Sequence, residues 1–196
     1  DFTQSFWTKT TSTVTSSATT APDGTSTGTK FIPNNGASSN AYLSQQLTIT
    51  SGNYYCISFY AKPAGFRYME VNGDAISGRI PVTAYFDLQN GVVTQLSGGT
   101  ASIQSVGNGW FRCVAIGLSS STVTQPFIRC SANGTTAATG DGTSGVYIWG
   151  AQLQNGTQVS VYNPTTSAAV YGPRFDYDPN PVNAVQQNLL PYSIWP

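Results

Sequence analysis

The chain has 196 residues, which is long enough for one domain with its own hydrophobic core. Charged residues make up 8% of it and the formal net charge is zero, so the basic stripe that nucleic acids or anionic membranes require is missing, and no apolar run approaches the roughly 20 residues of a membrane span. The 39% hydrophobic and 12% aromatic content predicts a packed core, with a surface of Ser, Thr, Asn and Gln suited to neutral, hydroxyl-rich ligands outside cells.

The first part of the chain, residues 8–29, is rich in Thr and Ser and contains one clear turn at Pro22-Asp23-Gly24. Because β-branched Thr favours an extended backbone, this part is predicted to form edge strands and loops.

Two central segments alternate apolar and polar residues with the period of a strand. In the first, the predicted core residues are Tyr55, Ile57, Phe59 and Ala61, and the opposite side carries Cys56, Ser58, Tyr60 and Lys62. In the second, the predicted core residues are Ile80, Val82, Ala84, Phe86 and Leu88, and the opposite side carries Arg79, Pro81, Thr83, Tyr85 and Asp87. Asn90-Gly91 then predicts a turn.

Residues 110–118 and 125–132 are predicted to form a hairpin around the Ser/Thr-rich loop 119–124, with Cys113 opposite Cys130. One face of this hairpin would carry Phe111, Ala115 and Ile128, and the other Arg112, Val114, Ile116 and Arg129. Alternation leaves open which of the two faces the core. Farther along, a third core stripe is predicted from Tyr147, Trp149, Ala151 and Leu153, with Gly150 and Gln152 on its other side.

Three cysteines, Cys56, Cys113 and Cys130, are present, and none lies at metal-ligand spacing from another. An odd number argues against a scaffold held together by disulfides. We expect small buried thiols in strands and no essential disulfide.

The C-terminal part differs from this body. Residues 171–181 are rich in Pro and Asp, which predicts a linker or an extended arm rather than a core strand. Near the end stand four large apolar residues that need a surface to cover them: Leu189, Leu190, Tyr192 and Trp195. A cluster of this kind usually marks an interface, and we expect it to contact another subunit or a neighbouring protein.

Three motifs, in this order and spacing, resemble a recurrent module of phage tail-fibre and other virion proteins. They are APDGT at residues 21–25, GNGWFRC at 107–113 and YIWGAQL at 147–153, the last followed by YNPT at 162–165. The module resembles the jelly-roll carbohydrate-binding families attached to glycoside hydrolases. The resemblance covers roughly residues 2–166.

The resemblance implies an all-β fold, an antiparallel β-sandwich of jelly-roll type over residues 1–166, with residues 167–196 as an extended arm. It implies a non-catalytic protein of the virion surface, such as a fibre, spike or capsid decoration, that contacts other virion proteins and engages a host surface glycan. Phage fibres and decorations are commonly trimers, so we expect a homotrimer. The alternatives are an accessory carbohydrate-binding module of a secreted glycoside hydrolase and a purely structural capsid cement protein.

Two motifs near the C-terminus, GPRFDYDP at residues 172–179 and NLLPYS at 188–193, usually lead into such a module. Here they follow it. This order predicts either one unit of a longer series or a tail that reaches into a neighbour. No cofactor is expected, although jelly-roll modules of this kind often hold a structural calcium ion, and Asp176 and Asp178 resemble the opening of a calcium loop.

Catalytic chemistry finds little support in the residues. The chain has no histidine, which removes mechanisms built on a Ser–His or Cys–His pair. Glu70 is the only glutamate, and its pairing with Asp74 or Asp87 as the two carboxylates of a glycosidase is disfavoured against solvated loop charges. We therefore expect no enzymatic activity.

Glycan recognition needs aromatic faces beside planar polar groups, and two places offer them. The first is the polar face of the central strands, with Tyr60, Tyr85 and Gln152, joined by Arg112 if that residue points outward. The second is the loop that contains Phe66 and Tyr68. Trp110 and Trp149 are expected in the core instead.

Overall fold

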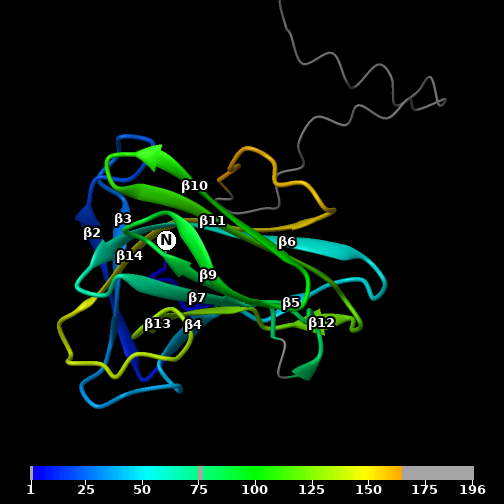
Figure 1. The fold of residues 1–196 in the computed structure, drawn as a ribbon, viewed down its shortest axis with the longest axis horizontal. Coiled ribbons are helices and arrows are strands. Elements are labelled where there is room, and N and C mark those ends of the chain that lie inside the picture. Colours follow the sequence, from blue (N-terminus) through cyan, green and yellow to red (C-terminus); the bar gives the residue numbers. More distant parts are fainter. Residues whose placement is uncertain (1, 75–76, 165–196) are drawn as a thin grey trace, which may run out of the picture. The chain divides into compact units, whose positions relative to one another are not determined.

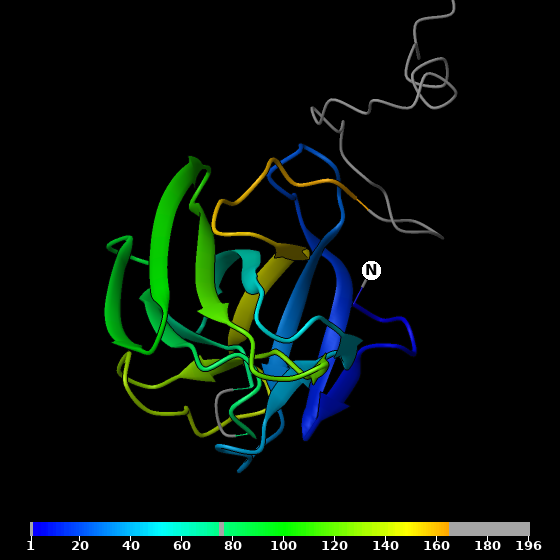
Figure 2. The ribbon, with the colours of Figure 1, turned by 90° about the vertical axis from the view of Figure 1, so that its right-hand side faces the viewer.

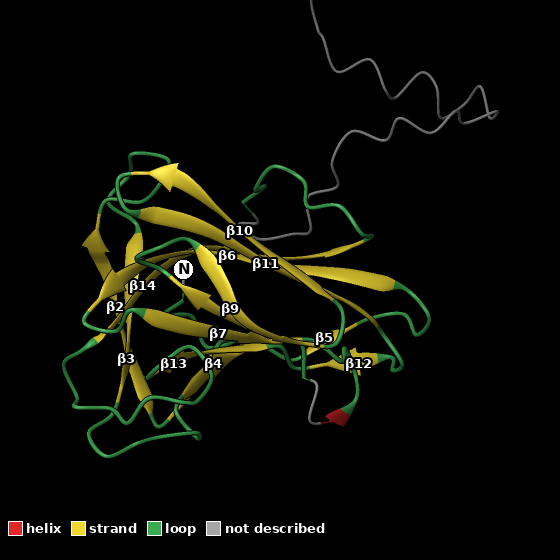
Figure 3. Cartoon of the chain, viewed as in Figure 1, coloured by secondary structure: helices red, strands yellow, loops and turns green. Residues whose placement is uncertain are grey.

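The computed structural model describes residues 2–74 and 77–164 (Figure 1). Regular structure in these residues is almost entirely strand, joined by loops and turns (Figure 3). The chain divides into one compact unit, Asp1–Tyr162, and a second unit, Asn163–Pro196. The predicted arm and its apolar residues Leu189, Leu190, Tyr192 and Trp195 lie outside the described residues.

Two six-stranded sheets make up the first unit, and every strand pairing in them is antiparallel. Sheet A has the order β1 (Thr8–Thr10), β4 (Tyr42–Ser44), β13 (Phe127–Ser131), β7 (Tyr68–Asn72), β8 (Thr83–Asp87) and β9 (Val92–Ser97). Sheet B has the order β10 (Thr100–Gly107), β11 (Trp110–Leu118), β6 (Tyr54–Ala64), β14 (Gly145–Asn155), β3 (Gly28–Pro33) and β2 (Ser12–Thr19). A short ladder joins β5 (Leu47–Thr48) to β12 (Val123–Thr124).

The chain repeatedly passes from one sheet to the other, for example from β6 to β7, from β9 to β10 and from β13 to β14. Figure 1 shows the two sheets as two layers, with β6, β10 and β11 on one side and β7 and β13 on the other. The predicted antiparallel β-sandwich of jelly-roll type is therefore confirmed. No helix in the described part of the chain is long and apolar enough to cross a membrane.

The core lies between the sheets and is built from the inward residues of both. Sheet B contributes, among others, Phe31, Ile57, Phe59 and Ala61, and sheet A contributes Met69, Val71, Ala84 and Phe86. The two stripes predicted from alternation, Tyr55 to Ala61 and Ile80 to Leu88, both belong to this cluster. Full burial of one such large apolar side chain stabilises the fold by about 1.5–3 kcal/mol, so the period-two pattern decides which face turns inward.

The predicted hairpin of residues 110–118 and 125–132 is wrong. Strand β11 belongs to sheet B, where Cys113 lies opposite Phe59, whereas β13 belongs to sheet A, where Cys130 lies opposite Met69. The segment between them crosses from one sheet to the other and pairs with β5 on the way. The structure also decides which face is buried, because Cys113, Ala115, Ile128 and Cys130 all belong to the core.

The predicted core stripe in β14 is wrong in its first half. Val146 and Ile148 are the buried residues there, so Trp149 points outward. A β-bulge between Trp149 and Gln152 then shifts the register, and beyond it Ala151 and Leu153 pack against the core as predicted. The extra residue of a bulge reverses which side alternate residues take.

All three cysteines are buried and free. Burial raises the pKa of Cys113 and of Cys130 far above that of an ordinary thiol, because the thiolate would lose its hydration. Both side chains pack in the core as small apolar groups.

Candidate functional site

The outward face of sheet B brings together three of the residues that the sequence singled out. Tyr60 in β6 lies between Arg112 in β11 and Trp149 in β14, each directly opposite it in the strand register. One step along the strands, Ser58 lies opposite Gln152. We call Tyr60, Arg112, Trp149, Gln152 and Tyr162 the outer-face cluster.

Three aromatic rings of the cluster pack edge to face. The Trp149 ring lies 4.6 Å from Tyr162 at an interplanar angle of 62° and 5.2 Å from Tyr60 at 66°. Tyr60 and Tyr162 are 6.2 Å apart at 75°. Aromatic pairs in such geometry contribute about 0.5–1.5 kcal/mol each beyond their buried area. All three side chains are only half-buried, so part of the aromatic surface stays accessible.

Gly150 makes this packing feasible. It takes a φ of 60° in the bulge, a left-handed conformation that side chains rarely adopt. A Cβ at this position would lie 2.9 Å from the Tyr60 ring and 3.5 Å from the Tyr162 ring. The glycine thus lets the chain bulge and leaves room for two of the three rings.

The loop between β2 and β3 holds two of the tryptophan side chains. The Trp149 indole N–H donates to Thr27 Oγ1 at 2.9 Å, and the Trp110 indole N–H donates to the Thr20 carbonyl at 3.0 Å. Trp110 is 1% exposed, so its predicted burial is correct, but its side chain is outside the hydrophobic core cluster. The expectation that Trp149 lies in the core is wrong, since it alternates with the buried residues Val146 and Ile148 and the bulge follows it.

The chain that follows β14 folds back over this face. In Figures 1 and 2 the orange segment lies on the side of sheet B away from β7 and β13. Gln152 Nε2 donates to Ser160 Oγ at 2.9 Å and to Gln154 Oε1 at 2.8 Å. The Ser160 backbone N–H donates to Gln154 Oε1 at 3.1 Å, and Tyr162 then reaches Trp149. These bonds position Tyr162 in the cluster.

Arg112 has an unusual environment within the described residues. Arg67, Arg79 and Arg129 each form an ion pair, with Asp87, Asp74 and Glu70 respectively. The Arg112 guanidinium instead stands over the Tyr60 ring, 5.3 Å from its centroid, and its Nη2 donates to Ser58 Oγ at 3.3 Å. Its Nε is buried without a hydrogen-bond partner, and so is Gln152 Oε1.

Tyr85, which was predicted to share a face with Tyr60, Arg112 and Gln152, lies elsewhere, as do Phe66 and Tyr68 of the second predicted place. Tyr85 belongs to sheet A, opposite Glu70 and Gln95. Burial, together with the nearby Glu70 carboxylate, raises the pKa of Tyr85. Tyr68 is also in sheet A, with the Arg67 guanidinium 4.9 Å from its ring centroid.

Phe66 is partly buried and packs against the core. Sequence alternation alone could not separate these residues, because it shows which side of a strand a residue takes but not which sheet the strand joins. Tyr162 was missed altogether. A glycine inside a strand pattern, here Gly150, is the one sequence signal of the bulge that builds the cluster.

Polar side chains on the outward face of sheet A form ion pairs and hydrogen bonds with one another. Glu70 is fully buried and ion-paired with Arg129, whose Nη1 donates to the Ser39 carbonyl at 2.9 Å. Asn72 Nδ2 donates to Glu70 Oε1 at 3.1 Å. A buried charge is tolerated when it is paired and hydrogen-bonded in this way, so a structural role is enough to explain these contacts.

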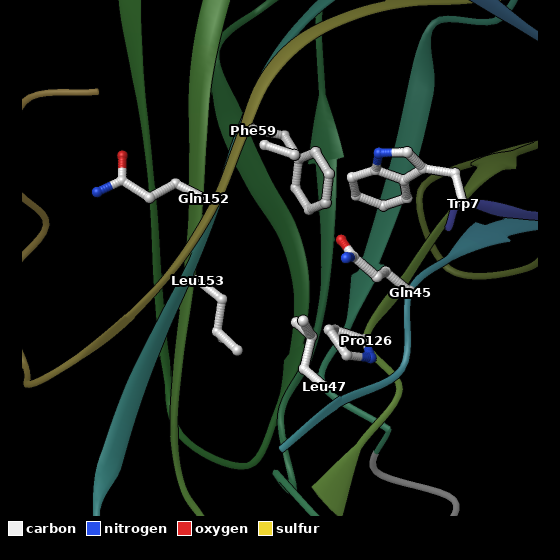
Figure 4. Close-up of a pocket in the computed structure, with 8 residues that line it drawn as sticks. Trp7, Gln45, Leu47, Phe59, Pro126, Gln152 and Leu153 are labelled. Carbon is white, nitrogen blue, oxygen red and sulfur yellow. The ribbon is translucent and has the colours of Figure 1, made fainter. Parts of the chain in front are cut away.

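One small cavity opens between the sheets (Figure 4). Its volume is about 50 Å³, and its lining residues are Trp7, Gln45, Leu47, Phe59, Pro126, Ala151, Gln152 and Leu153. Ligand pockets usually measure about 300–1,000 Å³, so this one is too small to hold a sugar. Figure 4 shows the Gln152 side chain pointing away from the other labelled residues. Among the described residues, no group of three or more Cys, Asp or Glu side chains could hold a metal ion.

Two solved structures are weakly similar to the chain. A CBM4 carbohydrate-binding module is 12% identical over 68% of this chain and 72% of its own, with a TM-score of 0.39. The enzymatically active domain of tailspike protein 4 from Bacteriophage CBA120 is 16% identical over 77% of this chain but only 19% of its own, with a TM-score of 0.41. No protein-family model and no curated protein matches the sequence. Function therefore has to be inferred from the residues of the chain itself.

Proposed function

We propose that this chain is a non-catalytic module that binds glycan at the outer-face cluster. The observation that carries this proposal is the convergence of three half-buried aromatic rings with an amide and a hydroxyl on one sheet face. The C–H edges of a sugar ring carry partial positive charge and pack against the negative face of an aromatic ring. Side-chain amides and hydroxyls both donate and accept, as sugar hydroxyls do.

The state of the carboxylates supports a non-catalytic role. A glycosidase needs one carboxyl group that stays protonated as general acid and a second that is ionised. Here Glu70, Asp74 and Asp87 each form an ion pair with an arginine, which are Arg129, Arg79 and Arg67 respectively. The pKa of Asp87 is lowered to about 2, first by the hydrogen bond from Arg67. No cofactor is needed for the proposed role, and Asp176 and Asp178, the start of the candidate calcium loop, lie outside the described residues.

We place the module on the surface of a virus particle, where it would engage a host glycan. The order of the three motifs in the sequence supports this location. The outer-face cluster would serve an accessory module of a secreted glycoside hydrolase equally well, so that remains the second candidate. The neighbours of the parent gene separate the two, since capsid or tail genes favour the first and hydrolase genes the second.

Assembly is part of the same proposal. We propose a homotrimer in which the apolar residues Leu189, Leu190, Tyr192 and Trp195 contact another subunit or another virion protein. Deletion of residues 183–196 should leave a folded sandwich that no longer assembles. Light scattering that shows the same oligomeric state for the truncated and full chains would refute this part.

A glycan array tests the central proposal. Wild-type protein should bind a subset of the glycans, and Trp149→Ala should weaken that binding about tenfold or more, since a loss of about 1.4 kcal/mol corresponds to a factor of ten. The matched control is Tyr68→Ala, which removes a half-buried ring from sheet A. Binding lost in Tyr68→Ala but kept in Trp149→Ala would contradict the proposal, as would the absence of any bound glycan.

A further inference from the structure

Cations collect on the outward face of sheet B. Its six strands, all within the described residues, hold three charged side chains: Lys30 in β3, Lys62 in β6 and Arg112 in β11. None of these strands contains Asp or Glu. The register places all three cations on the outward side, since Lys30 lies opposite Tyr147, Lys62 lies opposite Tyr147 from the other strand, and Arg112 lies opposite Tyr60.

This charge stands out because the chain is neutral overall. The carboxylates Glu70 and Asp87 are in strands of sheet A and already have arginine partners there. Burial raises the pKa of Tyr162, and the charge of Asp23 adds to the rise.

Arg112 has the free hydrogen-bonding capacity that an anion would use. Its Nε is buried without a partner, and its Nη2 makes one long bond to a neutral hydroxyl, Ser58. A guanidinium binds a carboxylate best through two parallel N–H groups, and this one stands over the Tyr60 ring. The unpartnered Gln152 Oε1, on the other side of β6, can accept a bond from a sugar hydroxyl.

We propose that the outer-face cluster selects glycans that carry a carboxylate, such as uronic or sialic acid units, and that Arg112 receives that carboxylate. This inference rests on the proposed glycan-binding function. Trp149 and Tyr162 would pack against the sugar ring while Nε and a terminal nitrogen of Arg112 donate to the two carboxylate oxygens. Because Nε is buried, the carboxylate reaches it only when a neighbouring side chain turns aside.

The test uses matched pairs of glycans. Oligogalacturonate, hyaluronan oligosaccharides and polysialate are each compared with their own carboxyl-reduced form, so that only the carboxylate differs. Wild-type protein should bind the acidic member of at least one pair about tenfold more tightly, as expected for hydrogen bonds to a charged group. Arg112→Met, which keeps the aliphatic stem over Tyr60, should remove this preference, so that the acidic and the reduced member of the pair bind with similar affinity.

Two further variants sharpen the result. Lys30→Met removes the same charge from the same face, three strands away from Arg112, and should change the preference less than threefold. Arg112→Lys keeps the charge but lacks the planar fork, and should lose most of the preference; it also answers the question if Arg112→Met does not fold.

Each outcome decides a separate point. Equal binding of both members of every pair, or a preference that survives Arg112→Met, overturns the inference and leaves the proposed function standing. Binding of none of the glycans, acidic or reduced, overturns both.

Discussion

The indole of Trp149 and the phenol ring of Tyr162 lie 4.6 Å apart, although one is in the middle of β14 and the other is beyond its end. Two features of the chain bring them together. The bulge at Gly150 keeps Trp149 on the outward face, and the hydrogen bonds between Ser160 and Gln154 turn the following segment back over that face. The proposed binding surface is therefore a consequence of one glycine and one return of the chain.

Gly150→Ala should damage this surface. The new Cβ would lie 2.9 Å from the Tyr60 ring, and the alanine would have to adopt a positive φ. We therefore expect a loss of about 1–3 kcal/mol in the free energy of unfolding. Gly24→Ala is the matched control, because Gly24 also has a positive φ, of 85°, but no atom within 4 Å of the new Cβ. Urea titration measures both. Equal losses in the two variants would show that the contact with Tyr60 adds nothing.

Arg129→Met should destabilise the fold by about 3–5 kcal/mol, because it leaves the fully buried Glu70 carboxylate without its partner. Adding Glu70→Gln to that variant removes the stranded charge and should restore at least half of the loss. A double-mutant cycle by chemical denaturation gives the coupling. If the double variant is no more stable than Arg129→Met alone, Glu70 does not carry the charge that this pairing implies.

Acid should weaken the fold through Asp87. Its pKa in the folded protein is about 2, below the ordinary value of 3.8, because Arg67 donates to the ionised form. A carboxyl group whose pKa is lowered on folding stabilises the fold fully above its unfolded pKa, and this contribution is lost as the pH falls through the folded pKa. Stability should therefore fall from about pH 5 to pH 2.

Arg67→Met should flatten that pH dependence, since it removes the main cause of the lowered pKa. Asp23 and Asp141 also have lowered pKa values, through hydrogen bonds that this change leaves intact. The informative quantity is consequently the difference between wild type and variant in denaturation midpoint, measured at each pH. A difference that stays constant from pH 6 to pH 2 would rule out this role for Asp87.

How much of this could be read from the sequence differs from element to element. The stripes Tyr55 to Ala61 and Ile80 to Leu88 were predicted correctly, because a single face of each strand meets the core and a register slip would expose every one of these side chains. The hairpin around residues 119–124 was predicted wrongly, because closeness in sequence does not tell whether a loop turns within one sheet or crosses to the other.

The residues of the candidate site were also predicted only in part. Tyr60 and Gln152 were predicted to point outward, whereas alternation left the side of Arg112 open, and all three meet on sheet B. Tyr85 and Tyr68 have the same outward parity but belong to sheet A. Strand pairing, which depends on contacts between residues far apart in the chain, decides this grouping. Period two also fails at a bulge, and for this reason Trp149 was placed in the core.

The thiols should stay free and protected. With Cys113 and Cys130 in different sheets and fully buried, an aromatic disulfide reagent at pH 8 should react with neither until the protein unfolds, after which all three cysteines should react. Intact mass without reductant should show no loss of two daltons. A bond mapped to Cys113 and Cys130 would contradict the described packing of the core.

The most direct measurement of the central claim is an NMR titration of the indole N–H signals with a glycan selected on the array. The chain has four tryptophans, and Trp→Phe substitutions assign their signals. If the glycan binds the outer-face cluster, the Trp149 signal should shift and saturate with the binding curve, while Trp110, which is 1% exposed and bonded to Thr20, should stay in place. Saturable binding that leaves the Trp149 signal unmoved would contradict the account, because the ligand would then lie on another face.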